Sequence, residues 1–588
     1  MSQGLYRLGR NTYRYVLRED HEVAERPTTS TGAAMVGRVL GTQPSTPLEF
    51  WVGVADGQYL QLDEVVITER TPPGGEPVQI SGIVSQVVAQ IDGARFDSDI
   101  FLIEDGVLPG DLSEAAQVTA TRVEPEVYVP PLPGAPVSKA RGKERERALF
   151  FDGMDKKLPA GVTRDNEPIY INLEFLNGTK GAHVNISGIS GIATKTSYAT
   201  FLLYSLFNSG TLGAEALNTK ALIFNVKGED LLFLDHHNIE LNEGHRAQYR
   251  ALELDPGPFA SVAFFAPPKL GDPNASPDVS SRPRGVTSFF WTLEEFCRDE
   301  LLPFVFADAE DDRQHYTMVV HNVAARLKQE ATPSGEGGVA IEGTQIRTFA
   351  ELIDFIVAKV QAEDWAGPVI GAGTINAFVR RLLGARRPLE RLIRGDVPDA
   401  EKHQIHDQKQ VTVVDLHNLP DRAKRFVVGV VLRGTFEKKE RSGGSHPQLY
   451  VVLDELNKYA PRDGNSPIKE ILLDVAERGR SLGIILIGAQ QTASEVEPRI
   501  VGQSAIRVVG RLDSAEAERG QYGFLRGAQR ERATIMKPGT MMLSQPEIPI
   551  PLVLEFPFPA WATRHSEAGV NPDAADHPDD PLEGLPQL

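Results

Sequence analysis

The sequence predicts an α/β protein in which a parallel sheet covered by helices follows a small antiparallel β-barrel. Between about residues 34 and 130, short runs alternate apolar and polar positions and are separated by Gly, Pro and Asp, as in hairpin-connected strands. Later in the chain, continuous apolar runs alternate with helical patterns, which is typical of parallel strands buried on both faces. At 588 residues the chain is too long for one core, so two to four domains are expected.

Five short runs predict the strands of the barrel: Met35–Leu40, Glu49–Val54, Tyr59–Leu62, Val65–Ile67 and Val78–Val84. A proline-rich segment, Pro130–Pro136, comes after them, and its prolines remove hydrogen-bond donors and fix the backbone. We therefore expect a barrel domain at 1–130 and a stiff linker at 131–165.

The central sheet is predicted from apolar runs that alternate with helices, as in a doubly wound sheet. After a first strand that begins near His183, the runs are Ala221–Val226, Val411–Asp415, Tyr450–Glu455, Ile484–Gln490 and Ile506–Gly510, with late strands at Thr540–Leu543 and Pro551–Glu555. We expect the core in two parts, at 166–286 and 401–564.

A helical insertion is predicted at 287–400, between the two parts of the core. Leu, Val, Ile and Phe recur there at three- and four-residue spacing, which predicts helices at Phe289–Phe306, Gln314–Glu330, Phe349–Glu363 and Thr374–Arg394. The last helix carries six arginines against one glutamate: Arg380, Arg381, Arg386, Arg387, Arg391 and Arg394, against Glu390. This cluster suits phosphates or acidic neighbours, and an ordinary solvated face explains it about equally well.

Composition and charge narrow the class of protein. A hydrophobic content of 41% and a charged content of 24% are those of a soluble globular protein. The single cysteine, Cys297, excludes an intramolecular disulfide and a cysteine-based zinc site, and it fits a reducing compartment. With no secretory signal and no apolar run long enough to cross a bilayer, we expect a cytoplasmic protein without a membrane partner.

The formal net charge of −19 argues against a surface that attracts nucleic acid everywhere, although a local channel is compatible with it. The segment 565–588 carries six acidic residues and no Lys or Arg. We expect it to be an acidic, disordered tail.

The stretch His183–Ser197 reads as an apolar strand, a glycine-bearing loop, a Lys-Thr pair and the start of a helix. Backbone N–H groups of such a loop bind a phosphate, the lysine neutralises its charge and the hydroxyl ligates Mg²⁺. The residues predicted to bind the nucleotide are Gly188, Ser190, Gly191, Ile192, Ala193, Thr194, Lys195, Thr196 and Ser197. The spacing departs from the usual pattern, because Gly188 stands seven residues before Lys195 and Thr194 replaces the second glycine. A plain Gly/Ser turn between strand and helix is the alternative.

Two adjacent carboxylates, Asp454 and Glu455, end the apolar run that starts at Tyr450. In open α/β sheets, ligands bind at the carboxyl ends of the strands. The first acid is suited to hold Mg²⁺ opposite Thr196, and the second is suited to position and deprotonate a water molecule. Together with the Lys-Thr loop, the pair predicts one magnesium-phosphate site.

Gln490 ends the next apolar run and is suited to orient that water or to sense the terminal phosphate; a polar cap of the strand is the alternative. Arg478 and Arg480 lie on the helix before this run. An arginine supplied to a neighbouring subunit would neutralise charge in the transition state, whereas a surface salt bridge is the competing explanation.

Two further patterns are weaker. Asn457–Ala460 resembles a guanine-reading motif but lacks its aspartate, so a GTPase loses support. The run Asp235–His237 has no third metal ligand at credible spacing, which favours a role in a loop.

The order of barrel, Lys195-Thr196, helical insertion, Asp454-Glu455 and Gln490 resembles the HerA-FtsK group of motor ATPases, and more closely the bacterial HerA-like ATPases with an N-terminal HAS barrel. The resemblance covers about residues 34–564. It implies a RecA-like P-loop core that takes ATP and Mg²⁺. The resemblance also implies that Lys195 and Thr196 bind phosphate and magnesium, that Asp454 binds magnesium and that Glu455 acts in catalysis. It further implies that Gln490 senses the nucleotide and that Arg480 or Arg478 acts in trans.

In that family the ATPases form hexamers that translocate double-stranded DNA, often with a nuclease, and some members occur beside NAD-consuming effectors in antiphage defence. The resemblance therefore implies a homo-hexameric, helicase-like motor with such an effector on its barrel-domain face. One stretch departs from the family, because Asn225 and Lys227 replace the acid and the histidine of its Asp-x-His-Gly-Glu segment.

A second hypothesis belongs to a different class. The altered phosphate loop and the net charge of −19 also fit a ring scaffold that uses bound nucleotide to assemble and control an effector with little translocation. A small-molecule kinase is disfavoured, since the sequence has no separate substrate domain.

Overall fold

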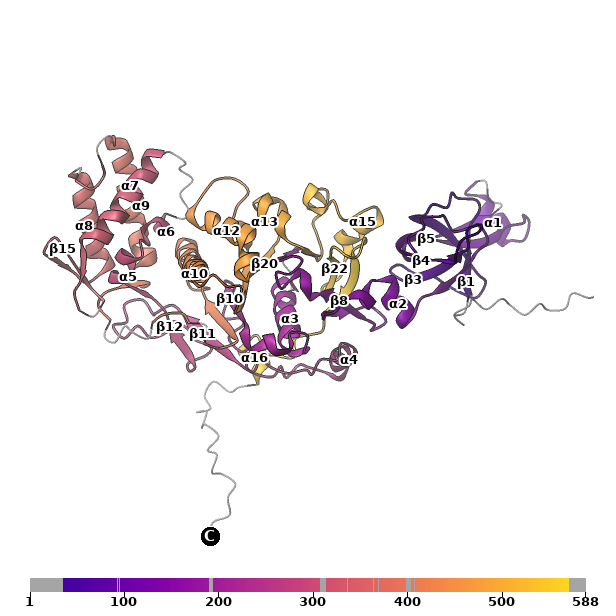
Figure 1. Ribbon diagram of the computed structural model, residues 1–588, viewed down its shortest axis with the longest axis horizontal. Helices are drawn as coiled ribbons and strands as arrows, with labels where there is room; N and C mark the ends of the chain where they lie inside the picture. Colours follow the sequence, from indigo (N-terminus) through magenta and orange to yellow (C-terminus); the bar gives the residue numbers. More distant parts are fainter. Residues whose placement is uncertain are drawn as a thin grey trace, which may run out of the picture. The chain divides into compact units, whose positions relative to one another are not determined.

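The structure is a computed structural model that describes residues 35–92, 94, 96–189, 194–306, 314–335, 337–362, 364–367, 370–397, 403–406 and 408–569 (Figure 1). The chain divides into two compact units, Met1–Asp152 and Gly153–Leu588. Most of the predicted acidic tail, residues 570–588, lies outside the described residues.

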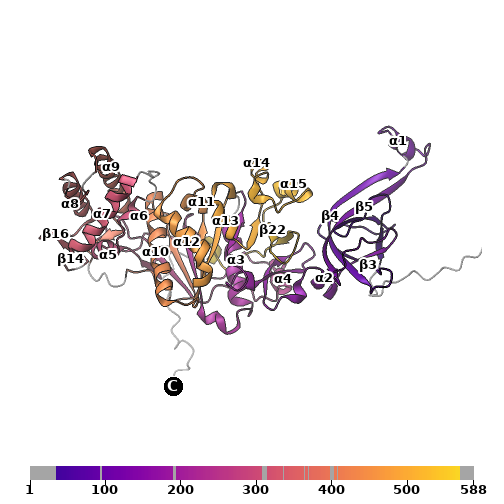
Figure 2. The ribbon, with the colours of Figure 1, turned by 45° about the horizontal axis from the view of Figure 1, so that its top comes forward.

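The first unit is a closed antiparallel barrel with strand order β1-β2-β5-β4-β3-β6. Its strands are β1 (Met35–Val39), β2 (Glu49–Val54), β3 (Val65–Arg70), β4 (Val78–Asp92), β5 (Asp111–Glu124) and β6 (Pro136–Lys139). Alternate positions such as Phe50 and Val52 are fully buried, as the alternation in the sequence predicts. Figure 2 shows that β4 and β5 extend as a long hairpin to the short helix α1 (Asp99–Glu104).

The barrel ends later than the sequence predicts. The segment expected to be linker contains β6, which pairs with both β1 and β3 and so closes the barrel. Pro136 stands at the first position of that strand, where a missing N–H is tolerated. Helix α2 (Lys143–Ala148) follows within the same unit, whereas the expected strand Tyr59–Leu62 does not form.

The second unit is built on a sheet that has twelve strands in the described residues, in the order β12-β11-β18-β10-β19-β20-β9-β21-β22-β23-β7-β8. The first eight pair in parallel and the last four are antiparallel. The predicted α/β core with a preceding barrel is therefore confirmed. The strands are β7 (Lys157–Val162), β8 (Pro168–Asn172), β9 (Val184–Ser187), β10 (Thr219–Asn225), β11 (Val262–Ala266), β12 (Val286–Ser288), β18 (Val411–Asp415), β19 (Gln448–Asp454), β20 (Ile484–Gln490), β21 (Ile506–Val509), β22 (Thr540–Ser544) and β23 (Leu552–Glu555).

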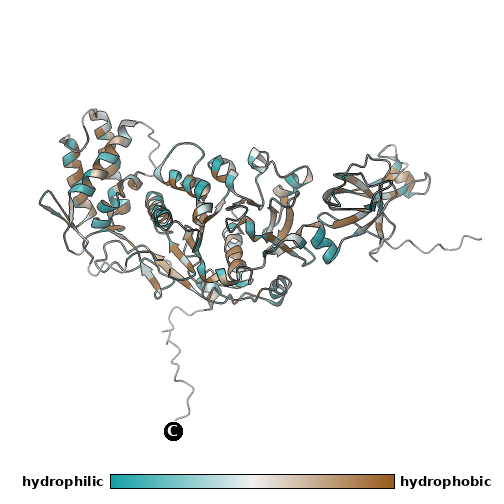
Figure 3. Cartoon of the chain, viewed as in Figure 1, coloured by the Kyte–Doolittle hydropathy of each residue, from teal (hydrophilic) through white to brown (hydrophobic). Residues whose placement is uncertain are grey.

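The strand arrangement is that of a RecA-like core, because β20 lies between β9, which leads into the Lys-Thr helix, and β19, which ends in the acidic pair. Every residue of β18, β19 and β20 is buried, as expected for strands covered on both faces. Figure 3 shows apolar strands at the centre and helices with polar outer sides around them. Strand β7 belongs to this sheet, so the expected linker at 131–165 is also too long.

Helices cover the sheet and set the position of the strand ends. Helix α3 (Thr194–Asn208) contacts β7, β9 and β20, and helices α10 (Asp421–Ser442) and α12 (Pro467–Leu482) pack against each other. The remaining helices of the core are α4 (Glu243–Ala251), α11 (Leu456–Tyr459), α13 (Pro498–Gln503), α14 (Ser514–Ala517), α15 (Ala528–Ile535) and α16 (His565–Ala568). Among the described residues, no helix combines the length and apolar character needed to cross a membrane.

The insertion is mainly helical, and Figures 1 and 2 show its helices grouped at one end of the sheet. Its helices are α5 (Leu293–Arg298), α6 (Leu302–Val305), α7 (Gln314–Glu330), α8 (Phe349–Gln361) and α9 (Ala372–Leu389). It also contains two small sheets that the sequence did not predict, β13 (Trp291–Thr292) with β17 (Ile393–Arg394), and β14 (Ala331–Pro333), β15 (Val339–Ile341) and β16 (Thr344–Ile346).

The single helix predicted at Phe289–Phe306 is wrong. The Thr292 side chain caps the start of α5, so the helix begins only at Leu293. Glu300 then adopts a positive φ of 51°, which ends the helical path before α6 begins.

Two glycines at helix C-termini test how tightly the amino ends of the strands are packed. Gly443 after α10 and Gly483 after α12 both have left-handed backbones, with φ of 65° and 68°. A Cβ at Gly443 would meet open space, whereas a Cβ at Gly483 would overlap the Ser445 carbonyl. We expect Gly443→Ala to cost about 1–2 kcal/mol of unfolding free energy and Gly483→Ala roughly twice that or more. Urea titrations of the two variants measure the difference, and equal costs would contradict this packing.

Candidate functional site

The carboxyl ends of five parallel strands bring polar side chains to one edge of the sheet. In register, Ser187 of β9 pairs with Gln490 of β20, and Asn225 of β10 pairs with Asp415 of β18. Asp454 ends β19, one position beyond the residue that pairs with Phe224. Residues from distant parts of the chain therefore form a single row.

Lys195 and Thr196 stand at the start of α3 and face this row. Lys195 is buried, and its Nζ donates a hydrogen bond to the Gly188 carbonyl at 2.8 Å. The Thr196 hydroxyl donates to Asp454 Oδ2 at 2.8 Å. The predicted lysine, hydroxyl and aspartate therefore meet, although they come from two separate strand-helix connections.

The pKa of the Lys195 ammonium is lowered to about 8, and burial is the main cause. The nearby Lys227 ammonium contributes to this lowering, while the Asp454 and Glu455 carboxylates oppose it. A buried cation at a sheet edge is stabilised when an anion arrives, so the site suits a phosphate.

Glu455 turns the chain away from the strand with a left-handed backbone, at φ of 56°, which is uncommon for a residue other than glycine. Its N–H donates to Asp454 Oδ1 at 2.8 Å, and its carboxylate pairs with Lys458 at 2.8 Å. These contacts fix the Glu455 carboxylate relative to the Asp454 carboxylate.

Gln490 is completely buried beneath this edge. Its Nε2 donates to Asn185 Oδ1 and to Ser187 Oγ, both at 2.9 Å. Its Oε1 has no hydrogen-bond partner in the described part of the chain. Gln490 therefore lies next to strand β9, which precedes the predicted phosphate loop, and its sensing role stays a prediction.

Several predicted loop residues cannot be placed. Ser190, Gly191, Ile192 and Ala193 lie outside the described residues, and of Thr194 only the backbone is described. Ser197 follows in α3 and is partly exposed.

The two predicted arginines are not brought to this site within one chain. Arg480 donates to the carbonyls of Gly178 and Thr179 at 2.9 and 2.6 Å, and Arg478 pairs with Glu440. Both stand in the last turns of α12, just before the amino end of β20. The seven residues of β20 separate them from Gln490, a span of roughly 20 Å.

Sequence reasoning missed Lys227 as a site residue. Its Nζ donates to Asp454 Oδ2 at 2.7 Å, the same oxygen that accepts from Thr196. The only signal was a departure from the family pattern, because a lysine in a loop has no periodicity that would mark it.

Asp415 and His417 were also missed. Asp415 is fully buried at the end of β18 and accepts from Asn225 Nδ2 at 2.9 Å. Burial raises the pKa of Asp415, and its 2.7 Å hydrogen bond raises the pKa of His417. An acid ending an apolar run was the available signal, since Asp454 was found from the same pattern.

Other polar patterns have local partners. Lys458 pairs with Glu455, and Asp235 forms a bidentate ion pair with Arg282 at 2.6 and 2.7 Å. Among the described residues, no group of three or more His, Cys, Asp or Glu side chains is placed to hold a metal ion.

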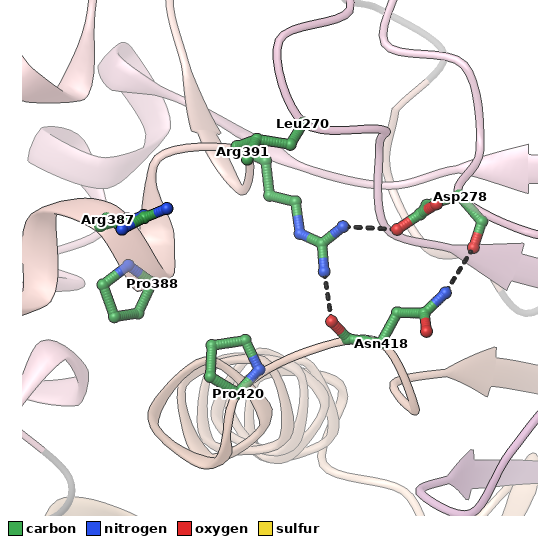
Figure 4. A pocket seen from close by; sticks show the side chains of 7 residues that line it. All are labelled: Leu270, Asp278, Arg387, Pro388, Arg391, Asn418 and Pro420. Atoms are coloured by element: carbon green, nitrogen blue, oxygen red, sulfur yellow. Dashed lines mark hydrogen bonds and ion pairs between the residues drawn. The ribbon is translucent and has the colours of Figure 1, made fainter.

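Half of the arginine cluster of the insertion forms ion pairs with acids of its own chain. Arg391 bonds to Asp278 at 2.6 Å and to the Asn418 carbonyl at 2.5 Å, on the wall of a cleft of about 560 Å³ (Figure 4). Arg394 pairs with Asp396 and Arg386 with Asp354. These pairs favour the acidic-neighbour explanation for three of the six arginines.

No protein-family model matches the sequence, and no curated protein sequence matches it. Among the solved structures to which this chain is similar are the following three. VirB4 of Thermoanaerobacter pseudethanolicus aligns at 15% identity over 68% of this chain and 96% of its own, with a TM-score of 0.42. The bacterial conjugative coupling protein TrwBΔN70 aligns at 10% identity over 71% and 93%, with a TM-score of 0.42. TrwB in complex with ADP and Mg²⁺ aligns at 11% over 72% and 95%, with a TM-score of 0.40. The site residues are assigned from the contacts of this chain.

The hydrogen bonds of Glu229, in the loop after β10, can be tested through the pH dependence of the unfolding free energy. Partial burial alone would raise the pKa of Glu229, but hydrogen bonds from Ser281 and Ser280 outweigh it and hold the pKa at about 2. A lowered carboxylate pKa stabilises the fold above the ordinary value of 4.5 and loses that contribution as the pH falls toward 2. We expect Glu229→Gln to cost about 1–2 kcal/mol at neutral pH and progressively less below pH 4.5, as measured by urea unfolding. Glu243→Gln, at an exposed glutamate of α4, is the control, and a cost that does not change with pH would contradict the assignment.

Proposed function

We propose that this protein is an ATP-hydrolysing, helicase-like motor of the HerA-like kind that translocates double-stranded DNA. The observation that carries the proposal is the meeting of Lys195, Thr196 and Asp454 at the carboxyl edge of a parallel sheet, with Glu455 next in the chain. Phosphate-binding and metal-binding groups are thereby held by one rigid sheet.

The donors at this edge fit ATP and Mg²⁺. A buried ammonium suits phosphate oxygens, and the Thr196 hydroxyl with the Asp454 carboxylate supplies the hard oxygen ligands that Mg²⁺ prefers. Gln490 Oε1 adds a buried acceptor without a partner among the described residues. The Thr196 hydroxyl and the Asp454 carboxylate would hold Mg²⁺, which would supply positive charge to stabilise the phosphate groups.

Each site residue then has a stated task. Lys195 neutralises phosphate charge, Thr196 and Asp454 hold the metal, and Glu455 accepts a proton from the attacking water. The hydrogen bond from the Glu455 N–H to Asp454 Oδ1 keeps the base at a fixed place relative to the metal ligand. Gln490 orients the water or senses the terminal phosphate.

We further propose a homo-hexamer in which Arg480 or Arg478 serves the site of the next subunit. Support comes from their place at the opposite end of the strands, since neither can reach the site of its own chain. The resemblance to HerA-like ATPases favours double-stranded DNA in the ring channel. It also favours an effector, a nuclease or an NAD-consuming enzyme, on the barrel-domain face, and a role in antiphage defence.

A nucleotide-regulated ring scaffold is the second candidate. The ion pair between Lys227 and Asp454 favours it, because a lysine on the magnesium ligand opposes metal binding and so slows turnover. The net charge of −19 points the same way, since it repels a DNA backbone outside a local channel.

Glu455→Gln tests the ATPase assignment. We expect the variant to bind ATP with nearly unchanged affinity but to hydrolyse it at least about 100-fold more slowly, because the general base is lost. Phosphate release and binding of a fluorescent ATP analogue measure the two properties. Lys195→Ala is expected to lose binding itself, and wild-type turnover in Glu455→Gln would refute the assignment.

Displacement of the third strand from a DNA triplex separates the motor from the scaffold. The motor predicts ATP-dependent displacement by the wild-type protein and none by Glu455→Gln, together with DNA affinity that falls steeply with salt as counterions are released. Normal ATP turnover without displacement would refute the motor and favour the scaffold. The mass of the same protein with and without ATP gives the number of subunits.

A further inference from the structure

We propose that Lys227 is a second phosphate-binding cation of this site and that, before nucleotide binds, it is the counter-ion that magnesium must displace from Asp454. The inference rests on the proposed function, because it names a further residue of the same nucleotide site. It assigns a role to one of the two positions at which the sequence departs from the HerA-like pattern.

Lys227 and Thr196 share one oxygen atom of Asp454. Asp454 Oδ2 accepts from Lys227 Nζ at 2.7 Å and from the Thr196 hydroxyl at 2.8 Å. The Asp454 side chain is only 4% exposed, so Lys227 neutralises a carboxylate that is nearly removed from water. A metal held by Asp454 and Thr196 competes with Lys227 for that oxygen, because both are cations.

A displaced Lys227 ammonium has room to move toward bound phosphate. The Lys227 side chain is 41% exposed, so its flexible stem is free to move the ammonium a short distance toward the mouth of the site. Lys227 donates to the same Asp454 oxygen as Thr196, the residue that follows Lys195 in the chain. Burial and then the Lys227 charge lower the pKa of Lys195. Two cations at one site attract a polyanion more strongly than either does alone.

Asn225 holds the Lys227 loop in place. Its Nδ2 donates to the carbonyls of Gly228 at 2.9 Å and Asp230 at 2.6 Å, and to Asp415 Oδ1 at 2.9 Å. All three partners are acceptors, so the position needs a donor. An aspartate there would face the buried Asp415 carboxylate and two carbonyls with no proton to share. The amide at 225 is therefore what this arrangement requires.

The rest of the loop is tied down on both sides of Lys227. The Val226 carbonyl accepts from Lys424 at 3.3 Å, and the Glu229 carboxylate accepts from Ser280 and Ser281. Asp230 pairs with Arg564 at 2.8 Å. With the backbone fixed at these points, the Lys227 side chain is the part of the loop left to respond when the site fills.

Replacement of Lys227 by methionine tests the proposal, because it predicts two changes of opposite sign. Without magnesium, a fluorescent ATP analogue should bind at least about tenfold more weakly to Lys227→Met, since one charge-assisted hydrogen bond to phosphate is lost. With the analogue saturating, the magnesium concentration at half-saturation should fall by about threefold or more, since a competitor for Asp454 is gone. Equilibrium fluorescence measures both changes without reference to turnover.

Two control variants separate this role from general damage to the site. Lys328→Met removes a lysine of the insertion that pairs with Glu300 at 2.7 Å, and it should leave both binding of the analogue and the magnesium requirement unchanged. Lys227→Arg retains the positive charge and should keep magnesium-free binding close to wild type. Melting temperatures of all variants show whether each has folded.

The outcomes are distinct. If both properties of Lys227→Met worsen in parallel, or neither changes, the lysine is a structural ion pair and the proposal is overturned, while the proposed function stands. If the wild-type protein binds no ATP analogue even with magnesium, the proposed function fails and the proposal fails with it.

Discussion

The rest of the site depends on the hydrogen bonds and the ion pair that the Asp454 carboxylate accepts. Its oxygens accept from Thr196, Lys227 and the Glu455 N–H, which come from three different connections of the sheet. A carboxylate with so little exposure needs such donors, because an unpaired buried charge is costly. The parallel pairing of β10, β19, β20 and β9 brings these connections together. The geometry of the site therefore depends on the same strand pairing that stabilises the sheet.

Much of the fold was accessible from the sequence, because buried parallel strands are continuous apolar runs. The strands ending in Asp415, Asp454 and Gln490 were predicted to within two residues of their ends for that reason. Boundaries set by single contacts were not accessible. The closing strand β6 begins with Pro136 and looked like linker, because only its pairing with β1 and β3 makes it part of the barrel.

The predicted residues of the candidate site lie at the end of a strand or the start of a helix. Of the missed residues, Asp415 also ends a strand, whereas Lys227 lies in a loop. Lys195, Thr196 and Asp454 are next to or within regular elements, so register alone brings them together. Lys227 reaches Asp454 through a loop whose path is fixed by Asn225, and its position depends on hydrogen bonds to main-chain carbonyls that no side-chain pattern encodes. The departures from the family pattern were visible, but their meaning required the neighbouring Asp415.

The separation between α12 and the carboxyl edge has a consequence for assembly. An arginine of α12 reaches a nucleotide site only if two different surfaces meet, the amino edge of one chain and the carboxyl edge of the next. Such a contact is heterologous, so it repeats from head to tail and closes into a ring or continues as a filament. A two-fold pair would have to bury both edges in one interface, across the roughly 20 Å length of β20. A copy with one blocked edge would therefore leave one neighbour without its contact, so the ring could not close.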